Sequence, residues 1–247
     1  MKKLLLPALL LMAIIVASFW LIDNKAAAPT TTTNNQQGTN TQQTAGNTDT
    51  PPVFDKSAYS TGEPGSIWVV VNKQRPLSPK TYAPDDLTSV GGGQRLRAEA
   101  ASALNKLITD AKMADLYISP LSGYRSYSTQ VSVYNNEVTA NGQAVADTQS
   151  ARPGYSEHQT GLAIDVGGGG CGIEDCFGNT NEGKWVAANA YKYGFIIRYI
   201  PGKQTITGYR AEPWHIRYVG AALATEMRDQ NIQTLEEFFG LPAAPNY

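Results

Sequence analysis

Two short stretches that lie far apart in the sequence, Ser156–Asp165 and Glu212–His215, contain the only two histidines of the chain, His158 and His215. Each stretch also carries a carboxylate close to its histidine. Two imidazoles and one carboxylate are a common ligand set for a catalytic zinc ion, with a fourth position left for water. The chain therefore has to adopt a fold that brings these two stretches to one point, if they are to hold a metal ion.

The segment Gly161–Val166 has the alternation of a β-strand with one buried face. Its large apolar side chains fall on one face, and Gly161, Ala163 and Asp165 fall on the other. The two small residues leave room above the strand, and the carboxylate supplies an acceptor there. We therefore expect Asp165 to be a metal ligand, together with His158 from the residues just before the strand.

A second strand is predicted at Trp214–Val219, where apolar residues alternate with His215 and Arg217. Glu212 precedes His215 by three positions, which on a straight strand places it on the opposite face. Pro213 lies between them and cannot extend a central ladder, so we expect the chain to bend there. The bend would bring both side chains into one cavity, with His215 as the third ligand of one zinc ion and Glu212 as a general base.

Arg125 is a further candidate, at a strand-to-helix turn in the segment Ser122–Tyr127. A planar and permanently charged guanidinium suits a substrate carboxylate or a developing oxyanion. Gln130 lies one helical turn further along, and Ser156 lies two residues before His158. Both are polar groups that could assist Arg125 in holding a substrate.

The remaining pattern predicts an α+β fold with a small, largely antiparallel sheet, because helices come early and late around short strands without a βαβ rhythm. A helix over Arg95–Met113 follows a break at Gly91–Gly93 and has an apolar stripe, Leu96, Ala100, Leu104, Leu107 and Ala111. Further strands are expected at Ile67–Asn72, Leu116–Ile118 and Phe195–Tyr199, and further helices at Ser128–Thr139, Glu182–Lys192, Ala221–Asp229 and Leu235–Phe239.

The N-terminal residues differ in composition from the rest of the chain. Lys2 and Lys3 precede about 19 uncharged, mostly apolar residues, 4–22, long enough as a helix to cross a bilayer. We expect residues 1–25 to be a transmembrane anchor or, if they are cleaved, a signal peptide. Either way the domain would be extracytoplasmic, tethered to the cytoplasmic membrane or secreted. Residues 26–52 are rich in Thr, Asn and Gln and predict a disordered linker, and 53–247 predict a single domain.

The overall charge and the two cysteines limit the classes of function. A net charge of −1 over 247 residues argues against a nucleic-acid-binding protein, which would show a strong basic excess. Cys171 and Cys176 are the only cysteines, and in an exported protein a disulfide closing a small loop is expected. A separate thiolate metal site is disfavoured because no further Cys or His remains to complete it. We expect the domain to be a monomer.

Three motifs together resemble the VanY-type D-alanyl-D-alanine carboxypeptidases, zinc peptidases of bacterial peptidoglycan. They are Ser-Gly-Tyr-Arg-Ser at 122–126, Ser-Glu-His with Gly-Leu-Ala-Ile-Asp at 156–165, and Glu-Pro-Trp-His-Ile-Arg-Tyr-Val at 212–219. The similarity covers about Ile67 to Gly220. It implies a compact α+β zinc domain in which His158, Asp165 and His215 bind zinc and Glu212 is the catalytic base. It further implies that Arg125 holds the substrate, with Gln130 and Ser156 around its C-terminal end.

The resulting hypothesis is a zinc-dependent D,D-carboxypeptidase that removes the C-terminal residue of peptidoglycan stem peptides by Glu-assisted attack of metal-bound water. Two alternatives stay open within the same fold, an L,D-carboxypeptidase and an endopeptidase that cuts inside the stem. A non-catalytic wall-binding module is a third alternative, and the presence of Glu212 beside three ligands argues against it. A serine peptidase of the same substrate is disfavoured because no Ser-x-x-Lys occurs in the chain.

Overall fold

The computed structural model describes residues 54–247, and the predicted anchor and linker therefore lie outside the described residues. Among the residues described, no helix is long and apolar enough to cross a membrane. The elements in chain order are β1 Leu87–Gly91, β2 Gln94–Arg97, α1 Ala98–Met113, β3 Ser119–Ser122, α2 Tyr127–Asn141, α3 Gln143–Gln149, η1 Glu157–Thr160, β4 Ala163–Gly167, η2 Asp175–Asn179, α4 Asn181–Asn189, η3 Ala190–Tyr193, β5 Phe195–Tyr199, α5 Gln204–Thr207, β6 Glu212–Tyr218, α6 Ala221–Asp229 and α7 Leu235–Phe239.

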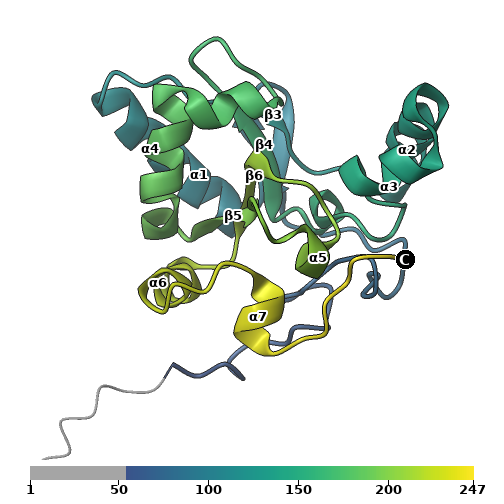
Figure 1. Cartoon of the computed structure of the whole chain (residues 1–247). Helices are drawn as coiled ribbons and strands as arrows, with labels where there is room; N and C mark the ends of the chain where they lie inside the picture. The colour runs from purple at the N-terminus through teal and green to yellow at the C-terminus, as the bar shows by residue number, and fades with distance from the viewer. Residues whose placement is uncertain (1–53) are drawn as a thin grey trace, which may run out of the picture. The chain divides into compact units, whose positions relative to one another are not determined.

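The strands form two antiparallel sheets, which confirms the expected α+β class. The larger has four strands in the order β3-β4-β6-β5, and the smaller is the hairpin β1-β2. Helices α1 and α4 lie on one side of the four-stranded sheet and α2 and α3 on the opposite side (Figure 1). The sheet thereby separates an apolar layer from the side on which the polar site is found.

The main hydrophobic core lies between the sheet and α1. Every residue of the predicted stripe in this region is buried, from Leu96 to Ala111. A second cluster packs α6 and α7 against Trp68 and Val70. Because Leu162, Ile164 and Val166 are fully buried in the main core, the other face of β4 is free to carry the polar groups.

The segment Ile67–Asn72 is not a strand, contrary to the sequence prediction. The side chains from Trp68 to Val71 are buried, but the only bridge of this segment is an isolated one between Asn72 and Arg75. Arg217 donates to the carbonyl oxygens of Ile67 and Val69 at 3.1 and 2.8 Å. Side chains of arginines therefore satisfy backbone groups that a sheet ladder would otherwise pair, which β-propensity alone cannot reveal.

Other predicted boundaries shift by a few residues. The glycines at 91–93 form the turn of the β1-β2 hairpin, so helix α1 begins at Ala98 rather than Arg95. Leu116–Ile118 is not a strand as predicted, and the strand β3, Ser119–Ser122, follows directly after it. The helix expected over Glu182–Lys192 is α4 followed by the short helix η3. The elements β5, α6 and α7 have the predicted bounds.

Candidate metal centre

The sheet register brings the two predicted motifs together. Asp165 of β4 lies directly opposite His215 of β6 in the antiparallel ladder, so both side chains project from the same face. His158 lies in the short helix η1, which ends at Gly161 in a left-handed conformation with φ +69° just before β4. One ligand atom from each of these three residues lies within 4.8 Å of the others, and all three residues are buried.

His158 is oriented by a backbone carbonyl. Its Nδ1 lies 2.9 Å from the carbonyl oxygen of Gly123, an arrangement in which Nδ1 carries the proton and donates. The opposite ring nitrogen, Nε2, then has its lone pair free and lies 3.4 Å from Oδ2 of Asp165. A side chain at Gly123 would come within 2.6 Å of the carbonyl oxygen of Arg95. Glycine therefore allows the backbone at Gly123 to lie against the backbone at Arg95.

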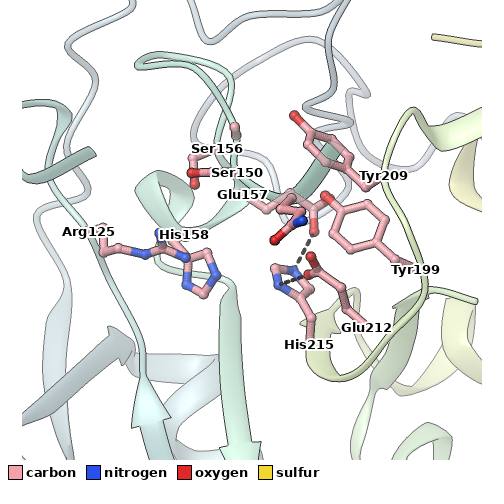
Figure 2. Close-up of a pocket in the computed structure, with 11 residues that line it drawn as sticks. Arg125, Ser150, Ser156, Glu157, His158, Tyr199, Tyr209, Glu212 and His215 are labelled. Carbon is pink, nitrogen blue, oxygen red and sulfur yellow. Dashed lines mark hydrogen bonds and ion pairs between the residues drawn. The ribbon is translucent and has the colours of Figure 1, made fainter. Parts of the chain in front are cut away.

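His215 faces the site with Nδ1, whereas His158 faces it with Nε2. Nε2 contacts Oε2 of Glu157 at 3.3 Å (Figure 2). Nδ1 lies 3.1 Å from Oδ1 of Asp165. Burial alone would lower the pKa of His215, but its hydrogen bonds to Asp165 and Glu157 raise it to about 9. The surroundings of Nδ1 therefore favour a positive charge at that atom.

Glu157 is a functional residue that the sequence reasoning missed. Its carboxylate is fully buried and accepts hydrogen bonds from Arg198 at 2.8 Å and Arg217 at 2.7 Å. Burial would raise the pKa of Glu157, but these two guanidinium groups hold it well below its usual range. Arg198 in turn makes two hydrogen bonds to Glu236 of α7. The sequence offered one signal for Glu157. Arg217 lies on the same polar face of β6 as His215, and a buried arginine there needs an acidic partner.

Glu212 lies beside the three predicted ligands, but the strand β6 begins at Glu212 and contains Pro213, whereas the sequence predicted a strand from Trp214 after a bend. Its Oε2 is 3.7 Å from Nδ1 of His215. The register between β5 and β6 shifts between Ile197 and Tyr199, and this irregularity lets Glu212 share a side with His215 although it is three positions away. Burial raises the pKa of Glu212 to about 7. A nearby cation would lower that pKa and leave a carboxylate ready to accept a proton.

Arg125 reaches the same centre from the turn before α2. Its Nη2 lies 3.8 Å from Oδ2 of Asp165, and Nη1 donates to Oε1 of Gln130 at 3.1 Å. Gln130 is fully buried, lies behind Arg125 and is absent from the pocket lining, so in the structure it positions the guanidinium. Ser156 does line the pocket, as does Ser150, which the sequence did not single out.

The three ligand residues fit a zinc ion. Oδ1 of Asp165 is buried and faces Nδ1 of His215 at 3.1 Å, a contact whose geometry leaves this acceptor incompletely satisfied, and a cation would complete it. Burial alone would raise the pKa of Asp165, but the charges and hydrogen bonds of the two histidines lower it, so the group is an anion. Two imidazole nitrogens and one carboxylate oxygen, each imidazole held by a second acceptor, are the donor set and support of a catalytic zinc site.

Two cavities meet at this centre. The smaller is lined by Ser150, Ser156, Tyr199 and Tyr209 (Figure 2). The larger extends past Asp165 toward α2 and the loop after β4. Arg125, His158 and Glu212 line both cavities. The site therefore has a small polar pocket on one side and an open groove on the other.

Comparison with known proteins identifies relatives with the same organisation. The family model described as VanY, D-alanyl-D-alanine carboxypeptidase, matches residues 93–221. The protein YodJ of Bacillus subtilis (strain 168) is 44% identical over 187 residues, which are 71% of this chain and 68% of that protein.

Solved structures extend the comparison to three dimensions. The LdcB LD-carboxypeptidase has a TM-score of 0.66 and 43% identity, covering 72% of this chain and 87% of its own. A mutant of the vancomycin-resistance D,D-pentapeptidase VanY, in complex with Zn(II), has a TM-score of 0.61 and 35% identity, covering 69% and 97%. VanYB in complex with D-alanine-D-alanine has a TM-score of 0.62 and 34% identity, covering 70% and 96%.

The matched segment includes all three motifs, the fold is shared, and a relative binds Zn(II). Together with the buried His158, Asp165 and His215, these findings show that the chain belongs to the VanY D-alanyl-D-alanine carboxypeptidase family and is a zinc carboxypeptidase.

Proposed function

We propose that this enzyme removes one residue from the C-terminus of peptidoglycan stem peptides, with the D,D reaction as the first candidate. The observation that carries the proposal is the placement of Glu212 and Arg125 on either side of the three metal ligands, at the mouth of a small polar pocket. A base, a cationic anchor and a pocket for one small residue are what a carboxypeptidase of this kind requires.

In the proposed mechanism the protein supplies the base, the anchor and the orientation of the ligands. Zinc bound by His158, Asp165 and His215 would supply a Lewis acid that polarises the scissile carbonyl and acidifies water. Glu212 accepts the proton of the attacking water and passes it to the departing amine. Arg125, held by Gln130, attracts the free carboxylate of the substrate or the oxyanion that develops during attack.

The two cavities suggest how the substrate lies. Ser156, Tyr199 and Tyr209 line the smaller pocket and not the larger groove, and Arg125 lies where the two meet, so we assign the smaller pocket to the terminal residue with its free carboxylate. The larger groove is open and accommodates the rest of the peptide. An enzyme with this arrangement shortens free peptide ends, which favours the carboxypeptidase over an endopeptidase.

The L,D reaction is the second candidate because the L,D-carboxypeptidase LdcB shares 43% identity with this chain. The D,D enzyme removes the last D-alanine of a pentapeptide, whereas the L,D enzyme shortens a tetrapeptide. Incubation of residues 53–247 with each peptide, with and without a chelator, followed by mass spectrometry, separates these outcomes. Loss of one alanine from the pentapeptide alone supports the D,D reaction. If neither peptide is shortened in the presence of zinc, the proposed function is wrong.

We also propose that residues 4–22 hold the enzyme at the outer side of the cytoplasmic membrane, with 26–52 as a spacer. The support is the length and apolarity of the segment and the lysines before it. Cell fractionation with an epitope at the C-terminus tests this. Recovery in the medium would indicate cleavage of the segment, and recovery in the cytosol would contradict export.

A further inference from the structure

We propose that a cavity separate from the metal centre, called here the basic cavity, binds the phosphodiester groups of a polyol or sugar polymer. Three basic and three aromatic side chains line it, Lys73, Lys80, Arg152, Tyr127, Tyr155 and Tyr247. None of these six residues lines the catalytic pocket or the groove beside it. The binding site therefore does not depend on which peptide bond the enzyme cuts.

The charges of the basic cavity are only partly balanced by the protein. Arg152 binds both carboxylate oxygens of Asp147, with Nε at 3.0 Å and Nη2 at 2.8 Å. Among residues 54–247, Lys73 and Lys80 have no acidic partner within ion-pair distance. Two ammonium groups thus line one cavity without a carboxylate of their own, and an anion bound between them would be attracted by both.

Lys73 is held in a defined position although it is buried. Its ammonium donates to the carbonyl oxygens of Gly208 at 2.6 Å and Pro245 at 3.2 Å. An ammonium has three protons, so one is left for a ligand. Burial lowers the pKa of Lys73, the charge of Asp147 opposes this shift, and the charge of Arg152 adds to it. An anion in the cavity would stabilise the charged form of this lysine.

Lys80 is exposed, but the loop 150–156 holds its stem. Gly154 has φ +85°, and a Cβ at Gly154 would come within 3.0 to 3.3 Å of three stem carbons of Lys80. The ammonium of Lys80 lies over the ring of Tyr155, 4.9 Å from its centroid. The carbonyl oxygen of Lys80 accepts a hydrogen bond from Gln159 at 2.7 Å. The side chain and the backbone of Lys80 are therefore both fixed next to this loop.

The kinds of donor in the basic cavity suit a phosphate group better than a carboxylate. A planar carboxylate is best matched by a planar guanidinium, and the guanidinium of Arg152 is already paired with Asp147. Ammonium groups are compact point charges that contact the oxygens of a tetrahedral phosphate from different directions. Lys73 and Lys80 supply two such groups, so phosphate is the anion that the cavity favours.

The three tyrosine rings favour a polymer over a free inorganic anion. Tyr155 and Tyr247 meet edge to face with ring centroids 5.2 Å apart, and Tyr127 is the first residue of α2. Aromatic rings offer apolar faces to the C–H groups of polyol or sugar units, which inorganic phosphate lacks. A phosphodiester between two such units satisfies both the rings and the ammonium groups. The proposed location outside the membrane would place the enzyme among polymers of the cell wall.

The loop 150–156 connects the basic cavity to the catalytic pocket. Arg152 and Tyr155 line the cavity, whereas Ser156 lines the pocket. The hydroxyl of Tyr247 accepts a hydrogen bond from the backbone amide of Arg152 at 2.8 Å. The same hydroxyl lies 3.1 Å from that of Tyr209, a residue of the catalytic pocket. A polymer held in the cavity would thus keep the metal centre close to peptides of the same wall.

The test measures binding of three probes to the full chain in neutral detergent by titration calorimetry. The probes are a glycerol phosphate oligomer, a galacturonate oligomer with the same number of charges, and inorganic phosphate. The galacturonate oligomer has sugar units and carboxylates, so it separates phosphodiester recognition from charge alone. The variants are Lys80→Gln and Lys80→Arg. The matched control is Lys192→Gln, because Lys192 also lies over a tyrosine ring but is outside the basic cavity.

The wild-type protein should bind the glycerol phosphate oligomer more tightly than the galacturonate oligomer, and inorganic phosphate most weakly. Lys80→Gln should weaken binding of the glycerol phosphate oligomer about three- to tenfold. The binding that remains should fall less steeply with added salt. Lys80→Arg and Lys192→Gln should bind as the wild type does. Zinc content and unfolding midpoint should be equal in all four proteins, since Lys80 is exposed and is not a metal ligand.

Three results would overturn the proposal. Equal affinity for the two oligomers would show that the cavity attracts any polyanion. Equal losses in Lys80→Gln and Lys192→Gln would show that only the overall surface charge matters. Binding of inorganic phosphate alone, or of no probe, would exclude a polymer site. Because binding is measured without hydrolysis, an enzyme that cleaves no stem peptide would contradict the proposed function and leave these results unaffected.

Discussion

His215 contacts an acid on each side of its ring, Asp165 at Nδ1 and Glu157 at Nε2. The contact with Glu157 places a proton on Nε2, so Nδ1 is the nitrogen available to a metal ion. His158 is oriented in the same manner by the carbonyl of Gly123. Acceptors of this kind behind metal-binding histidines raise ligand basicity and lock ring orientation.

Replacement of Glu212 by glutamine should separate metal binding from catalysis. Glu212 is beside the ligands rather than one of them, so Glu212→Gln should retain zinc measured by elemental analysis. Loss of the proton acceptor should lower kcat by about 10²- to 10⁴-fold. A variant that digests stem peptides at the wild-type rate would show that the base is another group.

Replacement of Glu157 by glutamine should weaken zinc binding by about 10- to 100-fold, because an amide is a poorer acceptor for the proton on Nε2 of His215. Competition with a chromogenic chelator measures the affinity. Glu236→Gln is the matched control, since it removes the same charge from the same arginine cluster without contact to His215. Equal affinities in the two variants would show that Glu157 supports only the fold.

At the scale of elements, the strands β4 and β6 could be predicted because their alternation is regular. The ligands of both motifs follow from this alternation and from the rarity of histidine in the chain. The hairpin β1-β2 and the irregular segment at 67–72 could not be predicted in this way. The strands of the hairpin are short and lack a regular alternation of buried and exposed residues. The backbone at 67–72 is satisfied in part by Arg217, a long-range contact that leaves no local periodicity.

The roles of Glu157 and Gln130 were also hidden, since each acts through another side chain. Glu157 lies next to His158 in sequence, yet it supports His215, fifty-eight positions away. Gln130 supports Arg125 and does not line the pocket. Sequence spacing places residues on a face, but only the packed fold shows which neighbour they contact.

The disulfide loop allows a prediction at the same scale. In the double variant Cys171→Ser, Cys176→Ser, loss of this short closed loop should cost up to about 2 kcal/mol of folding free energy. For a domain of this size the midpoint of thermal unfolding should fall by roughly 4–8 °C. Zinc content should stay equal to wild type, because neither cysteine is among the three ligands. Calorimetry measures the unfolding midpoint, and elemental analysis measures the zinc content. Loss of zinc from the double variant would show that metal binding depends on the disulfide.

For the whole molecule, zinc should stabilise the fold, because the ligands come from η1, β4 and β6 and meet only when the sheet is formed. With free zinc about a hundredfold above its dissociation constant the gain is about 2.7 kcal/mol. Removal of the metal by a chelator should therefore lower the unfolding midpoint by roughly 5–10 °C. The His215→Ala variant provides the control, since its midpoint should be insensitive to chelator.

The hydrogen bonds that begin at Asn72 pass through Glu236, Arg198 and Glu157 before they reach His215. This route uses residues from near the start of the domain and from its last helix. Without α7, Arg198 would lack Glu236, the second of its two acidic partners. Docking of the last helix of the domain is thereby linked to the balance of charge behind the second histidine.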